Sequence, residues 1–278
     1  MTGQLGKAFE DRFGMPSDRP LSAHDETPLV RMASRRSVRQ FSERPIDDGL
    51  LNAILLATQS APAKSDLQQY SIIIIREASR RAQLAEIAGG TPWIATAPVV
   101  LVFLGDLRRL RTICTAHGRS YQNDNLDSFM NAAVDAGIAL ATCIQASESQ
   151  GLGTCPLSII RNRIADTAQF LDLPDQVFPL AALGLGYPAE QPAISLRLPP
   201  DVIQHQETYN DEAALTAIAA YDQRRAQTSP IADEKQRHID RFGVEPGMTW
   251  SKNAARQMAV PERAQFKQWL ESHGLTTD

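Results

Sequence analysis

Cysteine and histidine are scarce in this chain. Its 278 residues include three cysteines and five histidines. The cysteines lie far apart, and no C-x-x-C pair occurs. This excludes a conventional zinc site and makes a disulfide framework unexpected. Cys143 falls in an apolar segment and is interpreted as a core residue, and Cys155 has neither a nearby histidine nor the basic neighbourhood that activates a thiol. We expect no metal site and no cysteine nucleophile.

Long hydrophobic runs and an excess of positive charge are also lacking. No run approaches about 18 consecutive apolar residues, the length that suits a membrane span. The formal charge of -4 gives no electrostatic reason to expect nucleic acid as a partner. The first 14 residues contain acidic side chains and no apolar core of a secretory signal. We therefore expect a cytoplasmic protein with no membrane and no nucleic-acid partner.

The common nucleotide-binding motifs are missing. No G-x-G-x-x-G follows a strand pattern, and no G-x-x-x-x-G-K-[ST] occurs. The nearest glycine pair, Gly184 and Gly186, is followed by Tyr-Pro rather than by a helix. This argues against a Rossmann dehydrogenase.

The hydrophobic patterns predict a mixed α and β fold. Three apolar runs predict strands, and the continuous β-branched run at 71–76 predicts a strand that is buried on both faces. Asp47 or Asp48 can cap a helix, and Gly89-Gly90 can end one. Strands are expected at 71–76, 98–104 and 178–186, and helices within 1–25, at 29–34, from 48, at 78–88 and 126–150, from 161, and at 211–226 and 252–272.

The segment from Leu126 to Gln150 is the longest helix candidate, and it is apolar almost all round. A helix without a polar face needs cover on every side. In a chain of this size, a second subunit is a natural source of that cover.

The segment Ser34–Phe41 contains three arginines and two serines within six residues, at the end of one predicted helix. The planar guanidinium of arginine suits bidentate phosphate binding, and serine hydroxyls donate to phosphate oxygens. On composition alone a solvated basic patch is the better explanation of the segment. The choice between the two depends on the motifs further along the chain.

Together these motifs resemble the nitroreductase family, and the match extends from residue 30 to about 205. The closer likeness is to oxygen-insensitive NADPH nitroreductases and NADPH–flavin oxidoreductases, which also have R-L-P-P-like residues near 197–200 and a helical C-terminal region. Each motif alone is weak, and their shared order and spacing carry the resemblance. The motifs are R-R-S-V-R-Q-F at 35–41 with P-I at 45–46, A-P at 61–62, L-Q-Q-Y at 67–70, A-P at 97–98, G-L-G-T-C-P at 151–156 and L-G-L-G-Y-P at 183–188.

The resemblance implies an α+β fold with an antiparallel-rich sheet flanked by helices, assembled as an intertwined homodimer. It implies an FMN-binding core at 27–205 and a helical C-terminal excursion at 206–278. The pattern of residues 1–26 is interpreted separately, as an N-terminal arm that packs on a partner subunit or as a frayed segment. The implied activity is transfer of two electrons from NADPH (or NADH) through FMN to a nitroaromatic, quinone or flavin by a ping-pong mechanism. Two alternatives remain: a flavin-dependent reductive dehalogenase or flavin-fragmenting enzyme on the same fold, and a flavin-binding or redox-sensing protein with little turnover.

The resemblance also implies which residues contact FMN. Arg39 corresponds to a cation near N1 and the C2 carbonyl of the ring, where hydride transfer leaves negative charge, and no side chain acts as a general acid or base. The positions that contact the phosphate and ribityl group are occupied here by Arg35, Arg36, Ser37 and Arg197, and the position at the pyrimidine edge is occupied by Thr91. The loop that reaches FMN from the partner chain contains Ala63, Lys64 and Asp66. The N5 side is lined by Pro156, Leu157, Ser158 and Ile159.

Three positions depart from the subgroup's pattern. Ser195 stands where a lysine is usual, so the phosphate loses a charge that Lys64 can replace. Ser158 and Ile159 replace a pair of glycines, which narrows the space over the flavin. Thr91 stands in place of a glutamine. In the polar segment 229–247, Arg237, His238 and Arg241 can meet the 2′-phosphate of NADPH, although a solvated loop is the simpler interpretation.

Overall fold

The computed structural model describes residues 3–17 and 21–275. The chain divides into two compact units, the first containing residues 1–35 and 193–262 and the second containing residues 36–192 and 263–278. The connector expected after the first helix includes residues 18–20, which lie outside the described residues.

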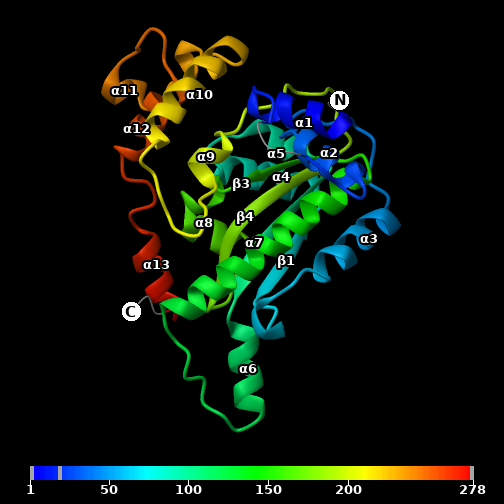
Figure 1. The fold of residues 1–278 in the computed structure, drawn as a ribbon. Helices are drawn as coiled ribbons and strands as arrows, with labels where there is room; N and C mark the ends of the chain where they lie inside the picture. The colour runs from blue at the N-terminus through cyan, green and yellow to red at the C-terminus, as the bar shows by residue number, and fades with distance from the viewer. Residues whose placement is uncertain (1–2, 18–20, 276–278) are drawn as a thin grey trace. The chain divides into compact units, whose positions relative to one another are not determined.

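The second unit is built on an antiparallel sheet of four strands in the order β1-β2-β4-β3 (Figure 1). The strands are β1 (Tyr70–Ile75), β2 (Val99–Asp106), β3 (Gly153–Leu157) and β4 (Val177–Gly186). The α+β class with an antiparallel sheet is therefore confirmed. The strand β3 was not expected, because its sequence, GTCPL, has a glycine and a proline that mask the strand pattern.

Strand β2 is the centre of the core, because its side chains alternate between two hydrophobic clusters. Val100, Val102 and Leu104 belong to one cluster, and Val99 and Leu101 belong to the other. The expectation that the 71–76 strand is buried on both faces was wrong. β1 is an edge strand, and its Ile74 is 45% exposed.

Helices cover both faces of this sheet (Figure 1). α4 and α5 contribute to one cluster, while α3 and α7 contribute to the other. Asp47 caps α3 by accepting a hydrogen bond from Leu50 N–H, and Gly89 and Gly90, both at positive φ, follow α4, as expected. The helices of this unit are α3 (Asp48–Gln59), η1 (Lys64–Asp66), α4 (Ala78–Ile87), α5 (Pro92–Thr96), α6 (Arg108–Ala116), α7 (Leu126–Ser149), η2 (Ile159–Arg161), α8 (Ile164–Phe170) and α13 (Phe266–Ser272).

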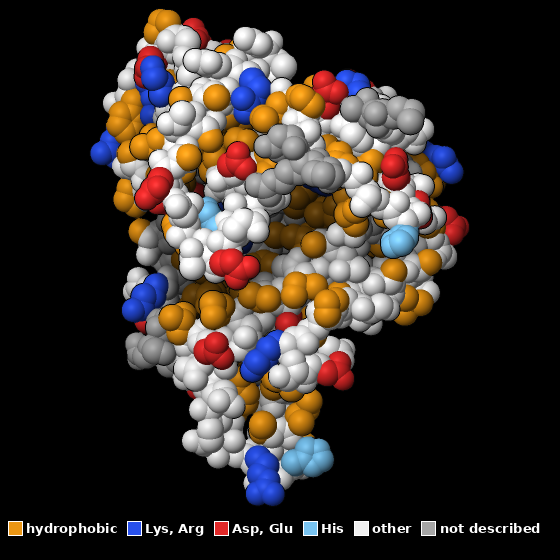
Figure 2. All heavy atoms as spheres, viewed as in Figure 1, with side chains coloured by type: hydrophobic (Ala, Val, Ile, Leu, Met, Phe, Trp, Pro, Cys, Tyr) orange, Lys and Arg blue, Asp and Glu red, His pale blue; other side chains and the backbone are white. Residues whose placement is uncertain are grey.

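The long helix α7 has one face in the core and one face in solvent. Ala136, Ala139 and Cys143 are fully buried beside the sheet, whereas Met130 and Val134 are 55% and 50% exposed. Hydrophobic side chains line its course on the face drawn in Figure 2. α7 is long and apolar enough to cross a membrane, but its packing against the sheet is that of a core helix.

The first unit is helical in its described part, with α1 (Gln4–Phe13), α2 (Glu26–Ser34), α9 (Pro200–Ile203), α10 (Ala214–Thr228), η3 (Asp233–Lys235), α11 (Ile239–Phe242) and α12 (Trp250–Met258). The Tyr221 ring packs edge-on against Trp250, with centroids 5.5 Å apart. The single helix expected at 252–272 is instead two helices, α12 and α13, separated by residues that include Pro261.

Candidate functional site

The arginine-rich segment runs along the free edge of β3. The N–H of Val38 donates to the carbonyl oxygen of Thr154 at 2.9 Å, and Ser37 forms a parallel bridge with Thr154. Gly153 permits this close approach, because a Cβ at that position would lie 2.7 Å from the Val38 side chain. The sheet edge thereby holds the backbone at Ser37.

A second attachment holds the same segment after Arg39. Ser42 N–H donates to Tyr187 O at 2.8 Å, and Ala189 N–H donates to Gln40 O at 3.0 Å. Arg39 lies between the two attachments, is exposed, and has no hydrogen-bond or ion-pair partner among residues 3–17 and 21–275. The backbone at Arg39 is therefore held in place while its charge is available to a ligand.

The strand that anchors this segment is itself tied to α7. Thr154 is fully buried, and its Oγ1 donates a 2.6 Å hydrogen bond to Glu148 Oε1 near the end of α7. The segment, β3 and α7 are thus connected through Thr154.

The turn after β3 is in contact with the C-terminal part of the chain. Arg263 Nη2 donates to Ser158 Oγ at 3.2 Å, and Arg263 Nε donates to Asn162 Oδ1 at 2.9 Å. Pro156 is exposed, and Leu157, Ser158 and Ile159 are partly exposed. The serine that replaces a usual glycine thus supplies an acceptor for Arg263.

A second guanidinium lies near this turn. Arg161 donates to Leu180 O, and burial lowers the pKa of Arg161, with a further lowering by the charge of Arg263. Two guanidinium groups, those of Arg161 and Arg263, therefore lie close to this turn. The sequence motifs did not indicate Arg263, which is 105 residues from Ser158 in the chain.

Thr91, expected at the pyrimidine edge of the flavin, immediately precedes α5. Its Oγ1 donates to Ala88 O at 2.8 Å. The hydroxyl hydrogen is therefore engaged within the chain, and the oxygen remains able to accept a hydrogen bond.

The loop containing Ala63, Lys64 and Asp66 lies at the other edge of the sheet. It leads into β1, whereas the arginine-rich segment is bonded to β3, and β1 and β3 are the two edges of the sheet. Three strand spacings amount to about 14 Å. A single chain therefore places these two groups of expected FMN contacts at opposite edges of its sheet.

In the first unit, one buried arginine connects the segments that contain Arg35 and Arg197. Arg12 is 6% exposed; its Nε donates to Ala33 O at 2.7 Å and its Nη1 to Ser195 O at 2.7 Å, and a third donor bonds Arg35 O. Arg197 N–H donates to Arg12 O at 3.0 Å. The motifs did not indicate Arg12, because it lies outside them in an ordinary amphipathic helix.

The first unit also has a basic cavity of about 360 Å³, lined among others by Arg225, Lys235 and Arg237. No carboxylate is among its lining residues. Arg237 was expected near a phosphate, and its backbone is fixed by a 2.7 Å hydrogen bond to Asn253 Oδ1. Arg241, also considered for that role, lies over the ring of Phe242 instead.

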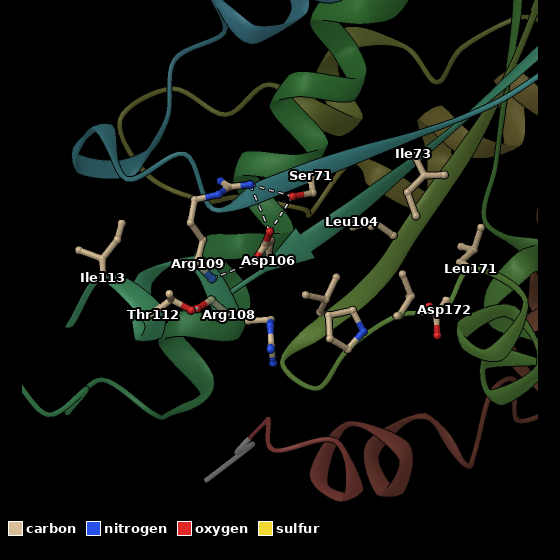
Figure 3. Close-up of a pocket in the computed structure, with 13 residues that line it drawn as sticks. Ser71, Ile73, Leu104, Asp106, Arg108, Arg109, Thr112, Ile113, Leu171 and Asp172 are labelled. Carbon is tan, nitrogen blue, oxygen red and sulfur yellow. Dashed lines mark hydrogen bonds and ion pairs between the residues drawn. The ribbon is translucent and has the colours of Figure 1, made fainter. Parts of the chain in front are cut away.

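A larger cavity of about 460 Å³ lies beside β1 and β2 in the second unit (Figure 3). Ser71 Oγ donates to Asp106 Oδ2 at 2.6 Å, and Arg109 donates to both side chains. Arg109 N–H also donates to Asp106 Oδ1 at 3.1 Å. These polar groups bond one another and join the strand ends to α6, and none of the expected FMN contacts lines this cavity.

The chain matches two protein-family models and several known proteins. Residues 32–187 match the model of the nitroreductase family, and residues 195–278 match the model of the C-terminal domain of that family. An FMN reductase [NAD(P)H] of Bacillus subtilis is 39% identical over 202 residues, covering 72% of this chain and 81% of the relative. An NADPH-flavin oxidoreductase of Vibrio harveyi is 31% identical over 247 residues, covering 89% and 97%.

Solved structures of similar proteins have the same fold as this chain. A hypothetical oxidoreductase of Bacillus subtilis has a TM-score of 0.81 at 33% identity, covering 90% of this chain and 98% of that one. The NADPH:FMN oxidoreductase of Vibrio harveyi in complex with NAD+ has a TM-score of 0.78 at 30% identity, covering 89% and 97%. The resemblance inferred from the motifs is confirmed: the chain belongs to the nitroreductase family.

Proposed function

We propose that the protein is an FMN-dependent oxidoreductase that takes two electrons from NADPH or NADH and passes them to a nitroaromatic, a quinone or a flavin in a ping-pong reaction. The relatives support the donor and the cofactor, because they are named FMN reductase [NAD(P)H], NADPH-flavin oxidoreductase and oxygen-insensitive NADPH nitroreductase. The acceptor and the order of steps are our inference.

The observation that carries this proposal is Arg39, an exposed cation whose backbone is hydrogen-bonded on both sides. FMN, when bound, supplies the hydride chemistry of the reaction. A guanidinium beside the ring would favour the state of the ring that carries more negative charge, as an oxyanion hole does. Such a site needs no acid–base pair of side chains, and Arg39 contributes electrostatics rather than a proton.

The other contacts that we propose follow the family pattern. Arg35, Arg36, Ser37 and Arg197 would hold the phosphate and ribityl group, with Lys64 replacing the charge missing at Ser195. The ring would be bordered by Thr91 and by the turn made of Pro156, Leu157, Ser158 and Ile159, and Ala63, Lys64 and Asp66 would belong to a partner's loop.

We propose a homodimer because one chain holds the two groups of contacts at opposite edges of its sheet. A second copy can bring the loop of one chain to the arginine-rich segment of the other. The exposed Met130 and Val134 of α7 provide apolar surface for this association.

For the nicotinamide donor, we propose that the 2′-phosphate of NADPH meets Arg225, Lys235 and Arg237. These three cationic side chains line their cavity, and no carboxylate is among its lining residues. Such a lining suits a dianionic phosphate. A cytoplasmic location fits a reaction that uses reduced nicotinamide and a chain whose three cysteines are free. In this proposal residues 27–205 form the FMN-binding core, with an arm at 1–26 and an excursion at 206–278.

An absorbance spectrum of the purified protein, followed by anaerobic titration with NADPH and with NADH, tests the proposal. We expect flavin absorbance near one FMN per chain, and bleaching by one equivalent of nicotinamide. A colourless protein that does not take up added FMN would contradict the proposed cofactor, and bound FMN that neither nicotinamide bleaches would favour a flavin-binding protein with little turnover.

A further inference from the structure

A buried carboxylate in the middle of α7 bonds the loop between α3 and β1. Asp135 is 1% exposed. Its Oδ1 accepts a hydrogen bond from Lys64 N–H at 2.9 Å, and its Oδ2 accepts one from Gln69 N–H at 3.0 Å. Aspartate is rarely buried this completely unless its oxygens are bonded. Here both oxygens are used, and both donors belong to the backbone of one loop.

The loop held by Asp135 has an unfavourable backbone conformation. Ser65, Asp66 and Gln68 all have positive φ, at 53°, 59° and 50°. Residues that have a Cβ rarely adopt this region, because Cβ approaches the backbone. The bond to Lys64 comes just before these residues, and the bond to Gln69 comes just after them. A restraint at each end can maintain a conformation that the loop's own sequence disfavours.

The loop side chains are free to meet a ligand. Lys64, Ser65, Asp66 and Gln68 are exposed, and the Gln68 amide donates to Asp66 Oδ1 at 3.1 Å. Asp135 itself is too deeply buried to reach a ligand. Any influence of Asp135 on the site must therefore pass through the loop.

We propose that Asp135 is a positioning residue of the flavin site, which holds the 64–69 loop in the left-handed conformation that presents Lys64 and Asp66 to FMN. This inference rests on the proposed function, in which the loop contacts FMN. It requires a carboxylate, because an asparagine would place an NH₂ donor against one of the two N–H donors.

The first test compares Asp135→Asn with Asp127→Asn. Asp127 is an exposed acid on the same helix, so its substitution makes the same change of charge away from the loop. We expect Asp135→Asn to weaken FMN binding by about tenfold to a hundredfold, the range for leaving a buried hydrogen-bonding group unsatisfied. We expect Asp127→Asn to bind FMN within about twofold of the wild type, since exposed charges contribute little. Equal FMN affinity in Asp135→Asn and wild type would overturn the proposal.

The second test separates positioning from general stability. Glycine adopts positive φ without strain, so adding Ser65→Gly to Asp135→Asn should recover a large part of the lost affinity. Leu67 has an ordinary φ of -79°, so Leu67→Gly in the same background should recover none. At saturating FMN, the midpoint potential of Asp135→Asn should differ from that of the wild type and return toward it with Ser65→Gly. Equal effects of the two glycine substitutions would show a role in overall stability and overturn the proposal.

A third measurement uses the wild-type chain, so it stands even if Asp135→Asn does not fold. In the FMN-free protein, NMR should find the amides of Lys64 and Gln69 protected from hydrogen exchange. Exchange of both at the rate of an unstructured peptide would overturn the inference. Failure of the wild type to bind FMN would instead count against the proposed function, because amide protection reports the Asp135 contacts without a ligand.

Discussion

Arg12 Nη1 donates a 2.7 Å hydrogen bond to the carbonyl oxygen of Ser195, 183 residues later in the chain. With the bonds from Arg12 to Ala33 and Arg35, it joins the end of α2 to the segment that leads to Arg197. The usual lysine is missing at position 195, yet the backbone there is held by a cation of this chain.

Replacing Arg12 by methionine should destabilise the protein, because the carbonyl groups that it bonds would lose their donors. A buried acceptor left unsatisfied costs about 1–3 kcal/mol, so we expect a loss of at least about 2 kcal/mol in the free energy of unfolding. Urea denaturation of Arg12→Met and wild type measures it. Arg31→Met, an exposed arginine on α2, is the matched control. A similarly small change in both variants would refute the role assigned to Arg12.

Arg39→Gln should change the potential of the flavin more than the affinity for oxidised FMN. Reduced flavin would lose an ionic contact of about 2–4 kcal/mol, as for an oxyanion-hole donor, which corresponds to a fall of about 40–90 mV for a two-electron couple. Potentiometric titration beside Arg108→Gln, an exposed arginine on α6, measures the shift. A variant that cannot retain oxidised FMN would show that Arg39 binds the phosphate group instead.

Val134→Asp should prevent dimer formation while leaving the fold of the chain intact. Val134 is 50% exposed in the single chain, whereas Ala133, on the same helix, packs against the chain's own core. A charge buried at a subunit interface is costly. Sedimentation velocity should therefore find monomers that have lost FMN, while Gln83→Asp on the exposed side of α4 remains a flavin-loaded dimer. A flavin-loaded monomer of Val134→Asp would contradict the shared site.

Arg237→Ala should raise the KM for NADPH and leave the KM for NADH unchanged, because only NADPH has the 2′-phosphate. Loss of a charged hydrogen bond costs about 1.5–3 kcal/mol, or roughly ten- to a hundredfold in KM. Steady-state kinetics with both donors measures the difference. Arg241→Ala, whose guanidinium lies over Phe242, should change neither KM. An equal rise for both donors would place Arg237 away from the 2′-phosphate.

Tyr70 should make the protein less stable at alkaline pH. Burial raises the pKa of Tyr70, and the negative charge of Asp135 raises it further. In the unfolded chain the phenol ionises near pH 10, before it does so in the folded protein. The contribution of the neutral Tyr70 phenol to the free energy of unfolding is therefore complete below about pH 10. It is lost as the pH rises through the pKa of Tyr70 in the folded protein. The decline of Tm above pH 10 should be smaller in Tyr70→Phe than in wild type; identical declines would show that Tyr70 does not contribute.

Local patterns predicted most of the fold from the sequence. Asp47 caps α3 and the Gly89-Gly90 pair follows α4 where expected, since caps and glycines act through neighbouring backbone. β3 was missed because its pairing with β4 depends on tertiary contacts rather than on strand propensity. The β-branched run of β1 was misread as central because local sequence does not specify which strand lies at a sheet edge.

The candidate site was predictable only where residues form motifs. The short segment around Ser37 and Arg39 has recognisable spacing, and the structure shows how its backbone is held. Arg12 and Asp135 act through backbone groups of distant segments, and any sequence can supply those groups. No sequence motif therefore indicates these two residues, and only the three-dimensional structure shows their contacts.

The placement of the arginine-rich segment and the 64–69 loop at opposite sheet edges has a consequence for inheritance. In the dimer that we propose, each site combines a segment from one chain with a loop from the other. A chain damaged only in its segment and a chain damaged only in its loop would each form inactive homodimers. Their mixed dimer would contain one site with both lesions and one site with neither, so two defective alleles in one cell could restore activity that neither provides alone.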